Sequence, residues 1–328
     1  MTKLSSRHIR VFMQNSTSPI ISHIKNFLDY LDIEKGLSGK TQENYSRYLD
    51  RFVKWLKKEN LELLKPHELM PDIVWNYRVF LSRQTMGKNT HEPLKKSTQN
   101  YYLIALRNLL SYFADKDIIS LPADKIKLAK QDRKKAVHFL TVEQIDELLK
   151  CANGVDLPGL RDRAILETLF STGLRVAEIV KLNRDQFAKA ESFLELNITG
   201  KGNKVRTIYF SDRALTHIKF YLNKRDDVDR ALFVNYRPGC EKLTDRRLTT
   251  RAVENVVKKY VLIAGLETKT SPHTLRHSFA TDLLMHGVDL RLVQEFLGHS
   301  DIGTTQIYTH VTDKQLREVH KQFHSKNS

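Results

Sequence analysis

Hydrophobic positions repeat with the period of an α-helix along the first third of the chain. Two stripes stand out: Ile24, Phe27, Leu28 and Leu31, and then Tyr45, Tyr48, Leu49, Phe52 and Leu56. Apolar residues at this spacing share one face of a helix. Segments 74–84 and 97–116 predict two further helices, whereas residues 86–96, rich in Gly, Asn, Pro and Lys, predict a loop. We therefore expect a small helical bundle.

The pattern changes after this bundle. Residues 125–137 are polar and basic with almost no apolar periodicity, as expected of a linker that lies along a phosphate backbone. Thr141, followed three residues later by Gln144, predicts a capping box that opens a second domain. Apolar residues alternate over 194–198, glycines follow at 200 and 202, and 205–210 returns, which predicts a β-hairpin with Lys201 at its tip.

These patterns predict a mainly α protein with a small antiparallel β-sheet in its second domain. The expected divisions are an N-terminal extension at 1–18, a helical domain at 19–124 and a basic linker at 125–137. The second domain follows at 138–312, and residues 313–328 form a C-terminal helix with an apolar stripe at Leu316, Val319 and Phe323.

Composition adds a strong positive charge to this picture. The 328 residues include 54 Lys and Arg against 38 Asp and Glu, a formal net charge of +16. Residues 1–130 contribute 22 − 13 = +9 and residues 131–328 contribute 32 − 25 = +7, so both halves can face the same polyanion. Nucleic acid is the expected partner, and a basic but merely solvated surface is the alternative.

Other sequence signals limit where the protein acts. Cys151 and Cys240 have neither metal-binding nor redox spacing, which favours reduced cysteines in a cytosolic protein. The first residues lack the apolar core of a signal peptide, and no stretch is long and apolar enough to span a bilayer. We expect a cytoplasmic, nucleoid-associated protein with no membrane partner.

Charged side chains gather at two helix starts. Arg175 follows the helix-breaking Gly173, and Glu178 lies one turn on, where a carboxylate can orient the guanidinium. His273 and Arg276 share a face just after Pro272, and a helix N-terminus adds partial positive charge there. An oriented Arg is a good phosphate ligand, although an Arg–Glu pair at this spacing is most often a surface salt bridge.

Further polar residues come later in the chain. His277 lies four residues after His273, as in a zinc helix, but Thr274 stands where the glutamate of an H-E-x-x-H site belongs. His299 directly follows Gly298, which is the expected cap of the preceding helix. Tyr308 comes shortly after, and taken alone it reads as a core or interface residue.

Together these residues suit one reaction. Two guanidiniums and a His can neutralise a pentacoordinate phosphate, a Lys can protonate a leaving oxygen, and a Tyr can attack as nucleophile. No acidic cluster suited to Mg²⁺ accompanies them. The set predicts phosphoryl transfer through a phosphotyrosyl intermediate, with no metal or other cofactor.

Four ordered segments resemble the motif boxes of the tyrosine recombinase, or phage integrase, family, and most closely its Xer-like branch. They are TGLRVAEIVKL, ITGKGNKVRTI, PHTLRHSFATDLL and FLGHSDIGTTQIYTHV. The resemblance implies a two-domain, C-shaped clamp, in which a helical core-binding (SAM-like) domain at 19–124 and a catalytic domain at 138–312 hold DNA between them.

The resemblance also implies a role for each residue. Arg175 and Arg276 would bind the phosphate, and Tyr308 would form the 3′-phosphotyrosyl bond. Lys201 would be the general acid, His273 the acid–base partner and His299 a further hydrogen-bond donor. The supporting residue would be Glu178, which buttresses Arg175, and His277 would be structural.

Contacts outside the active site are expected from position and from the resemblance. Basic residues beside helix starts or along the last helix of the first domain would contact DNA phosphates: Lys40, Lys95, Lys96 and Arg107. The helix at 313–328 would dock into a neighbouring protomer. This exchange predicts a tetramer on two duplexes, built from this chain alone or with a related second recombinase.

Several functions share this chemistry. We expect a site-specific recombinase that acts on double-stranded DNA with an inverted-repeat site, in Xer-like resolution of chromosome or plasmid dimers. The sequence shows no additional arm-binding domain, which favours that role over integration or excision of a mobile element. A type IB topoisomerase and a non-catalytic DNA-binding regulator of the same fold are the remaining alternatives.

Overall fold

The computed structural model describes residues 13–87, 90–130, 138–188, 194–200, 204–240 and 244–298. The chain divides into two compact units, Met1–Lys134 and Lys135–Ser328, and each is described by itself. The described residues are mainly helical, with a short antiparallel sheet in each unit. No described helix combines the length and apolarity needed to cross a membrane.

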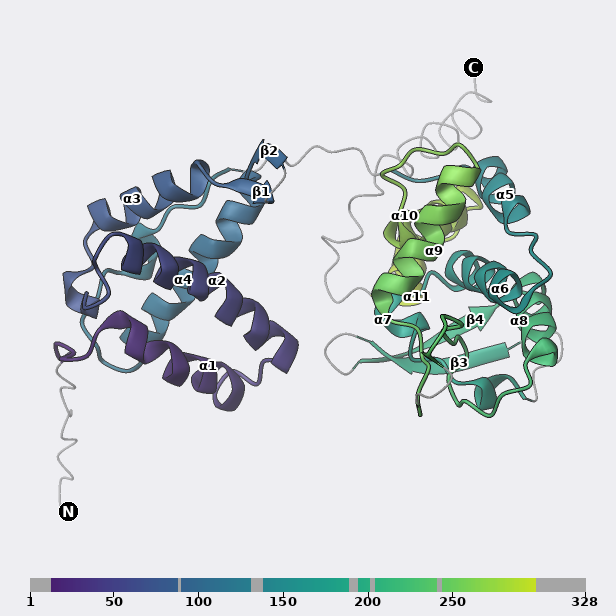
Figure 1. Ribbon diagram of the computed structural model, residues 1–328, viewed down its shortest axis with the longest axis horizontal. Helices are drawn as coiled ribbons and strands as arrows, with labels where there is room; N and C mark the ends of the chain where they lie inside the picture. The colour runs from purple at the N-terminus through teal and green to yellow at the C-terminus, as the bar shows by residue number, and fades with distance from the viewer. Residues whose placement is uncertain are drawn as a thin grey trace, which may run out of the picture. The chain divides into compact units, whose positions relative to one another are not determined.

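The first unit is a helical bundle (Figure 1). Its α-helices are α1 (His23–Ile33), α2 (Gly39–Lys58), α3 (Pro71–Ser82) and α4 (Lys96–Asp115), with single 3-10 turns at Ile20–Ser22, Pro66–Glu68 and Ala123–Lys125. The predicted stripes supply its core: Phe27 and Leu31 from α1, and Leu49, Phe52 and Leu56 from α2, are buried against α3 and α4.

Two segments of the first unit differ from the sequence prediction. The expected loop at 86–96 contains a hairpin of β1 (Thr85–Gly87) and β2 (Thr90–Pro93). Hydrogen bonds between the two backbone strands form this hairpin, and the sequence of the segment shows no alternation of apolar residues that would have predicted it. The first part of the predicted linker also packs on this unit, because Ile126 is buried in the core and the Asn100 amide forms two hydrogen bonds with the Ala129 backbone.

The basic residues predicted to contact DNA lie at or near helix starts, with one exception. Lys40 lies in the first turn of α2, and Lys95 and Lys96 begin α4; all three are exposed. Lys40 forms an ion pair with Glu43 at 2.6 Å. Arg107 lies further along α4 and is half-buried. Their contacts with DNA stay predictions.

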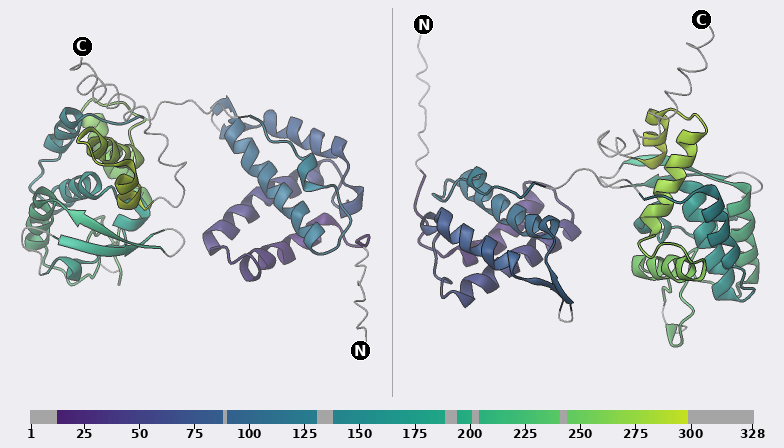
Figure 2. Two further views of the ribbon diagram at one scale, coloured as in Figure 1. Left: turned by 180° about the vertical axis from the view of Figure 1, so that it is seen from behind. Right: turned by 90° about the horizontal axis from the view of Figure 1, so that it is seen from above.

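The second unit surrounds a buried helix. It contains α5 (Val142–Cys151), α6 (Leu157–Thr172), α7 (Val176–Ile179), a 3-10 turn at Arg184–Phe187, α8 (Asp212–Lys224), α9 (Thr250–Ile263), α10 (Pro272–Met285) and α11 (Leu290–Leu297). Helix α6 contacts α5, α8, α9, α10 and the sheet, and its residues from Ala164 to Leu169 are buried (Figures 1 and 2). It therefore lies at the centre of the core.

Local sequence signals placed several elements of this unit correctly. The capping box of α5 is formed, since the Thr141 amide donates to Gln144 Oε1 at 3.0 Å. Strands β3 (Leu194–Thr199) and β4 (Val205–Phe210) pair antiparallel in full register, as the alternation predicted. Gly298 ends α11 in the left-handed conformation at φ +61°. Each of these features depends on residues close in sequence.

Candidate active site

The first predicted cluster forms at the start of α7. Helix α6 ends at Gly173, whose φ of +58° reverses the chain; a Cβ there would lie 2.5 Å from the Phe279 ring, so only glycine fits. Arg175 then caps α7. Its backbone N–H donates to Glu178 Oε2 at 2.8 Å, and its guanidinium donates to Glu178 Oε1 at 3.1 Å. The Arg–Glu pair is therefore formed, with 27% of the Arg175 side chain exposed.

The second cluster lies at the start of α10. Pro272 occupies the first turn, His273 is exposed, and Arg276 is buried with 4% of its surface accessible. The Arg276 guanidinium donates to the Gly173 carbonyl at 2.5 Å and to the Leu297 carbonyl at 2.5 Å. These bonds join α10 to the turn that carries Arg175 and to the end of α11.

His277 differs from its neighbour His273 in environment. Burial, together with the positive charges of His273 and Arg276, lowers the pKa of His277 to about 4. Its imidazole is therefore neutral near pH 7. A half-buried neutral ring on this side of α10 is consistent with the structural part expected of it.

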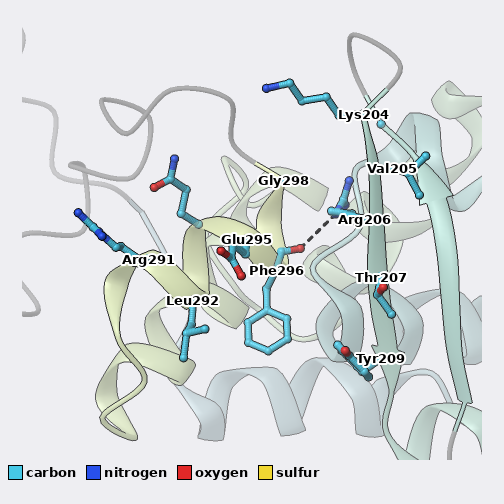
Figure 3. Close-up of a pocket in the computed structure, with 12 residues that line it drawn as sticks. Lys204, Val205, Arg206, Thr207, Tyr209, Arg291, Leu292, Glu295, Phe296 and Gly298 are labelled. Atoms are coloured by element: carbon cyan, nitrogen blue, oxygen red, sulfur yellow. Dashed lines mark hydrogen bonds between the residues drawn. The ribbon is translucent and has the colours of Figure 1, made fainter.

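Three arginines meet at the C-terminus of α11. Arg206 Nε donates to the Phe296 carbonyl at 3.1 Å (Figure 3). Arg276 donates to the Leu297 carbonyl, and Arg175 Nη2 donates to the Gly298 carbonyl at 3.2 Å. The last carbonyls of a helix lack partners within it and carry partial negative charge. Guanidiniums from three separate elements satisfy them, which brings the predicted phosphate ligands Arg175 and Arg276 together.

Glu178 holds the centre of this arrangement. Its carboxylate, 7% exposed, also accepts two hydrogen bonds from Arg206, at 2.9 and 2.8 Å. Burial opposes ionisation, but the hydrogen bonds from Arg206 and the Arg175 backbone, and then the charges of the two arginines, prevail and lower the pKa of Glu178 to about 2. The carboxylate therefore stays charged throughout the physiological range.

Arg206 was not predicted from the sequence. It lies on β4, where Ile208 and Phe210 point to the buried side of the strand and Arg206 shares that side. A charged residue on a buried strand face needs a partner of opposite charge. That signal was present, but the partner, Glu178, could not be named from it.

A groove of about 660 Å³ lies between β4 and α11 (Figure 3). Its charged lining residues are three cations, Lys204, Arg206 and Arg291, and one anion, Glu295. Gly200 and Gly298 also line it, and these directly precede Lys201 and His299 in the chain. The described site thus has an excess of positive charge, which suits an anionic ligand.

Three of the predicted catalytic residues, Lys201, His299 and Tyr308, lie outside the described residues. The helix at 313–328 does so as well. Their roles stay predictions. Arg175, Glu178, His273 and Arg276 are described. Arg175 bonds directly to Glu178, and Arg175 and Arg276 donate to the adjacent carbonyls of Gly298 and Leu297.

Comparison with known proteins identifies the family. Residues 138–315 match the phage integrase family, and residues 24–116 match the phage integrase N-terminal SAM-like domain. The chain is 36% identical over 311 residues to tyrosine recombinase XerD of Lacticaseibacillus casei, which covers 92% of this chain and 98% of the relative. This chain belongs to the phage integrase family.

As a member of that family, the protein is a site-specific, Xer-like tyrosine recombinase, a DNA strand-exchange enzyme. Tyrosine recombinase XerC of Pelotomaculum thermopropionicum is 34% identical over 317 residues, covering 92% of this chain and 97% of the relative. XerH recombinase bound to a palindromic difH substrate has a TM-score of 0.70 at 23% identity, covering 94% and 98% of the two chains. The predicted fold of an integrase catalytic domain with a SAM-like domain is confirmed.

The buried Glu178 gives the recombinase a pH-dependent stability. Because its pKa is about 2 in the folded protein, against 4.5 for the free side chain, the carboxylate stabilises the fold above about pH 4.5 and loses that effect as pH falls toward 2. We expect Glu178→Gln to lower the free energy of unfolding of the second unit by roughly 2–3 kcal/mol at pH 7, and by progressively less below about pH 4.5.

Urea titrations followed by circular dichroism at pH 7, 5 and 3.5 measure this difference. Both tryptophans, Trp55 and Trp75, lie in the first unit. Tryptophan fluorescence therefore follows unfolding of the first unit alone, and this transition should be the same in wild type and Glu178→Gln. A stability difference that stays constant from pH 7 to 3.5 would show that the charge of Glu178 is not what stabilises the fold.

Proposed function

We propose that this recombinase resolves chromosome or plasmid dimers by exchanging DNA strands at a specific site through Tyr308. The observation that carries the proposal is the meeting of Arg175 and Arg276 at one helix end, directly before His299. Two guanidiniums that chain folding brings together can bind the same phosphate. The relatives named XerC and XerD, at 34 to 36% identity over nearly the whole chain, favour dimer resolution over mobile-element integration.

The proposed chemistry conserves the phosphodiester energy. Arg175 and Arg276 bind the non-bridging oxygens, and Tyr308 Oη attacks the phosphorus as its proton passes to His273. The bond from phosphorus to O5′ breaks, and Lys201 donates a proton to the departing O5′. His299 donates a hydrogen bond to the phosphate, and Glu178 holds Arg175 in place. No cofactor takes part.

Rejoining reverses these steps with a different strand. The 5′-hydroxyl of the partner duplex attacks the 3′-phosphotyrosyl phosphorus, the bond to Tyr308 breaks, and the tyrosine regains its proton. Each cleavage is therefore matched by one ligation, and no external energy source is required. The two-step exchange needs active sites on two duplexes at once.

The proposed partner is double-stranded DNA with an inverted-repeat recombination site. In support, two solved structures similar to this chain are DNA complexes: XerH site-specific recombinase bound to a palindromic difH substrate, and a lambda integrase dimer bound to a COC′ core site. We propose a tetramer on two duplexes, made of this chain or of this chain with a related second recombinase, in which the 313–328 helix passes between protomers. Lys40, Lys95, Lys96 and Arg107 would contact phosphates, and the protein would act at the nucleoid in the cytoplasm.

Covalent capture tests the proposal directly. The full-length protein is incubated with sheared DNA from its own source without metal, denatured, and the DNA that stays attached is sequenced. We expect fragments that share one inverted-repeat site, located once per chromosome or on resident plasmids. Capture at the ends of a mobile element would support the integrase alternative, and site-independent capture would support a topoisomerase.

A reaction denatured at time zero serves as the control for non-covalent carry-over. If no DNA is retained above that control, even after addition of an extract that supplies a second recombinase, the proposed cleavage chemistry is wrong.

A further inference from the structure

Arg206 occupies a position that no catalytic assignment uses. Its side chain is 9% exposed, and it lies on β4, five residues after Lys201 in the sequence. Its guanidinium donates three hydrogen bonds: to both oxygens of Glu178, at 2.9 and 2.8 Å, and to the Phe296 carbonyl, at 3.1 Å. It therefore links α7 to the end of α11.

Two glycines pack directly against the same side chain. A Cβ on Gly298 would lie 2.7 Å from Arg206 Cδ, and a Cβ on Gly200 would lie 3.1 Å from Arg206 Nη1. Gly298 precedes His299 and Gly200 precedes Lys201. The backbone at both points approaches the guanidinium as closely as the absence of a side chain allows.

The residues that Arg206 contacts are bonded to Arg175 or lie next to other predicted catalytic residues in the sequence. Arg206 bonds to Glu178, which in turn bonds to Arg175. It also contacts the backbone at Phe296 and Gly298, directly before His299 in the sequence. A third contact is with Gly200, directly before Lys201 in the sequence. The three segments come from distant parts of the chain, and a misplacement of about 1 Å in a catalytic group can slow a reaction about a hundredfold.

We propose that Arg206 is a positioning residue for strand cleavage: its single buried guanidinium holds Glu178, and through Glu178 the phosphate ligand Arg175, against the end of α11. The proposal rests on the proposed role of Arg175 as a phosphate ligand. Arg206 itself does not touch the DNA phosphate in this scheme. Both the charge and the planar fork are needed, because the carboxylate and the carbonyl lie on different sides of the guanidinium.

Three variants of the full-length protein test this proposal, with labelled sheared DNA from the same source as the probe. Arg206→Gln removes the charge and the fork, and Arg206→Lys keeps only the charge. Arg161→Gln is the matched control, because Arg161 is equally buried, donates twice to Asp162 Oδ1 and once to the Val234 carbonyl, and lies outside the site.

At saturating protein, we expect Arg206→Gln to slow formation of the covalent adduct by about 100-fold, with DNA affinity within about threefold of wild type. Arg206→Lys should be slowed nearly as much. Arg161→Gln should keep the wild-type rate within about twofold, despite a comparable loss of stability. Adding Glu178→Gln to Arg206→Gln should slow the reaction little further, because the two residues act as one unit.

Three outcomes would each overturn the proposal. They are adduct formation at the wild-type rate in Arg206→Gln, at the wild-type rate in Arg206→Lys, or equally slow adduct formation in Arg161→Gln. Hydrogen exchange separates this outcome from a failure of the proposed function. The Arg175 amide donates to Glu178. Its hydrogen-exchange rate should therefore rise in Arg206→Gln and stay at the wild-type value in Arg161→Gln, whether or not an adduct forms. Unchanged protection of that amide would also overturn the proposal.

Discussion

Tyr308→Phe is expected to abolish the covalent protein–DNA adduct while leaving DNA binding intact. The substitution removes one oxygen, the atom proposed to bond to phosphorus, and keeps the ring. Without it no phosphotyrosyl bond can form, so adduct formation should fall by more than about 10⁴-fold. The basic surface, with its net charge of +16, is retained, so affinity for duplex DNA should not change.

Denaturing gels with labelled DNA measure the adduct, and fluorescence anisotropy at fixed salt measures binding. Tyr209→Phe is the matched control: Tyr209 lies on β4 beside the same groove and is 39% exposed. It should form adduct at the wild-type rate. If the adduct persists in Tyr308→Phe and disappears in Tyr209→Phe, the nucleophile is Tyr209 and the assignment of Tyr308 is wrong.

Arg276→Gln is expected to damage both stability and chemistry. The buried guanidinium donates to the carbonyls of Gly173 and Leu297. A glutamine cannot reach both, and buried carbonyls left without donors should lower the free energy of unfolding of the second unit by about 2 to 4 kcal/mol. Loss of one phosphate ligand should separately slow adduct formation by roughly 10²- to 10³-fold.

The two effects are separated by measuring adduct formation at a temperature where circular dichroism shows the variant folded. Tryptophan fluorescence, which reports only the first unit, should show an unchanged transition. Arg225→Gln is the control, since Arg225 is also buried, pairs with Asp227 and donates to the Ala231 and Leu232 carbonyls. A folded Arg276→Gln that forms adduct as fast as Arg225→Gln would remove Arg276 from the catalytic set.

Features that depend on neighbouring residues were predictable. The Thr141–Gln144 capping box, the β3–β4 hairpin, the Gly298 cap and the Arg175–Glu178 pair each involve residues that a single turn or strand brings together. Their physics is local: a side chain satisfies a helix amide, an alternating pattern buries one face, and a glycine accepts a positive φ. The family resemblance followed from the same short segments.

The missed features are of two kinds: a local hairpin, and contacts between distant parts of the chain. The β1–β2 hairpin is formed by backbone pairing in a polar segment, and residues after 124 bind the first unit because Asn100, on α4, reaches the Ala129 backbone. Neither leaves a periodic pattern in the sequence. Arg206 had a visible signal, its place on a buried strand face, but that signal named no partner.

The amino-acid sequence therefore indicated the Arg175–Glu178 pair and the placement of His273 and Arg276 at a helix start, because these properties arise within a few residues. It did not specify that Arg175, Arg206 and Arg276 meet at three successive carbonyls of one helix end. That meeting requires α7, β4, α10 and α11 to pack around the same point. A guanidinium can bond to any exposed carbonyl or carboxylate, so its actual partners follow from which elements approach it in the folded domain.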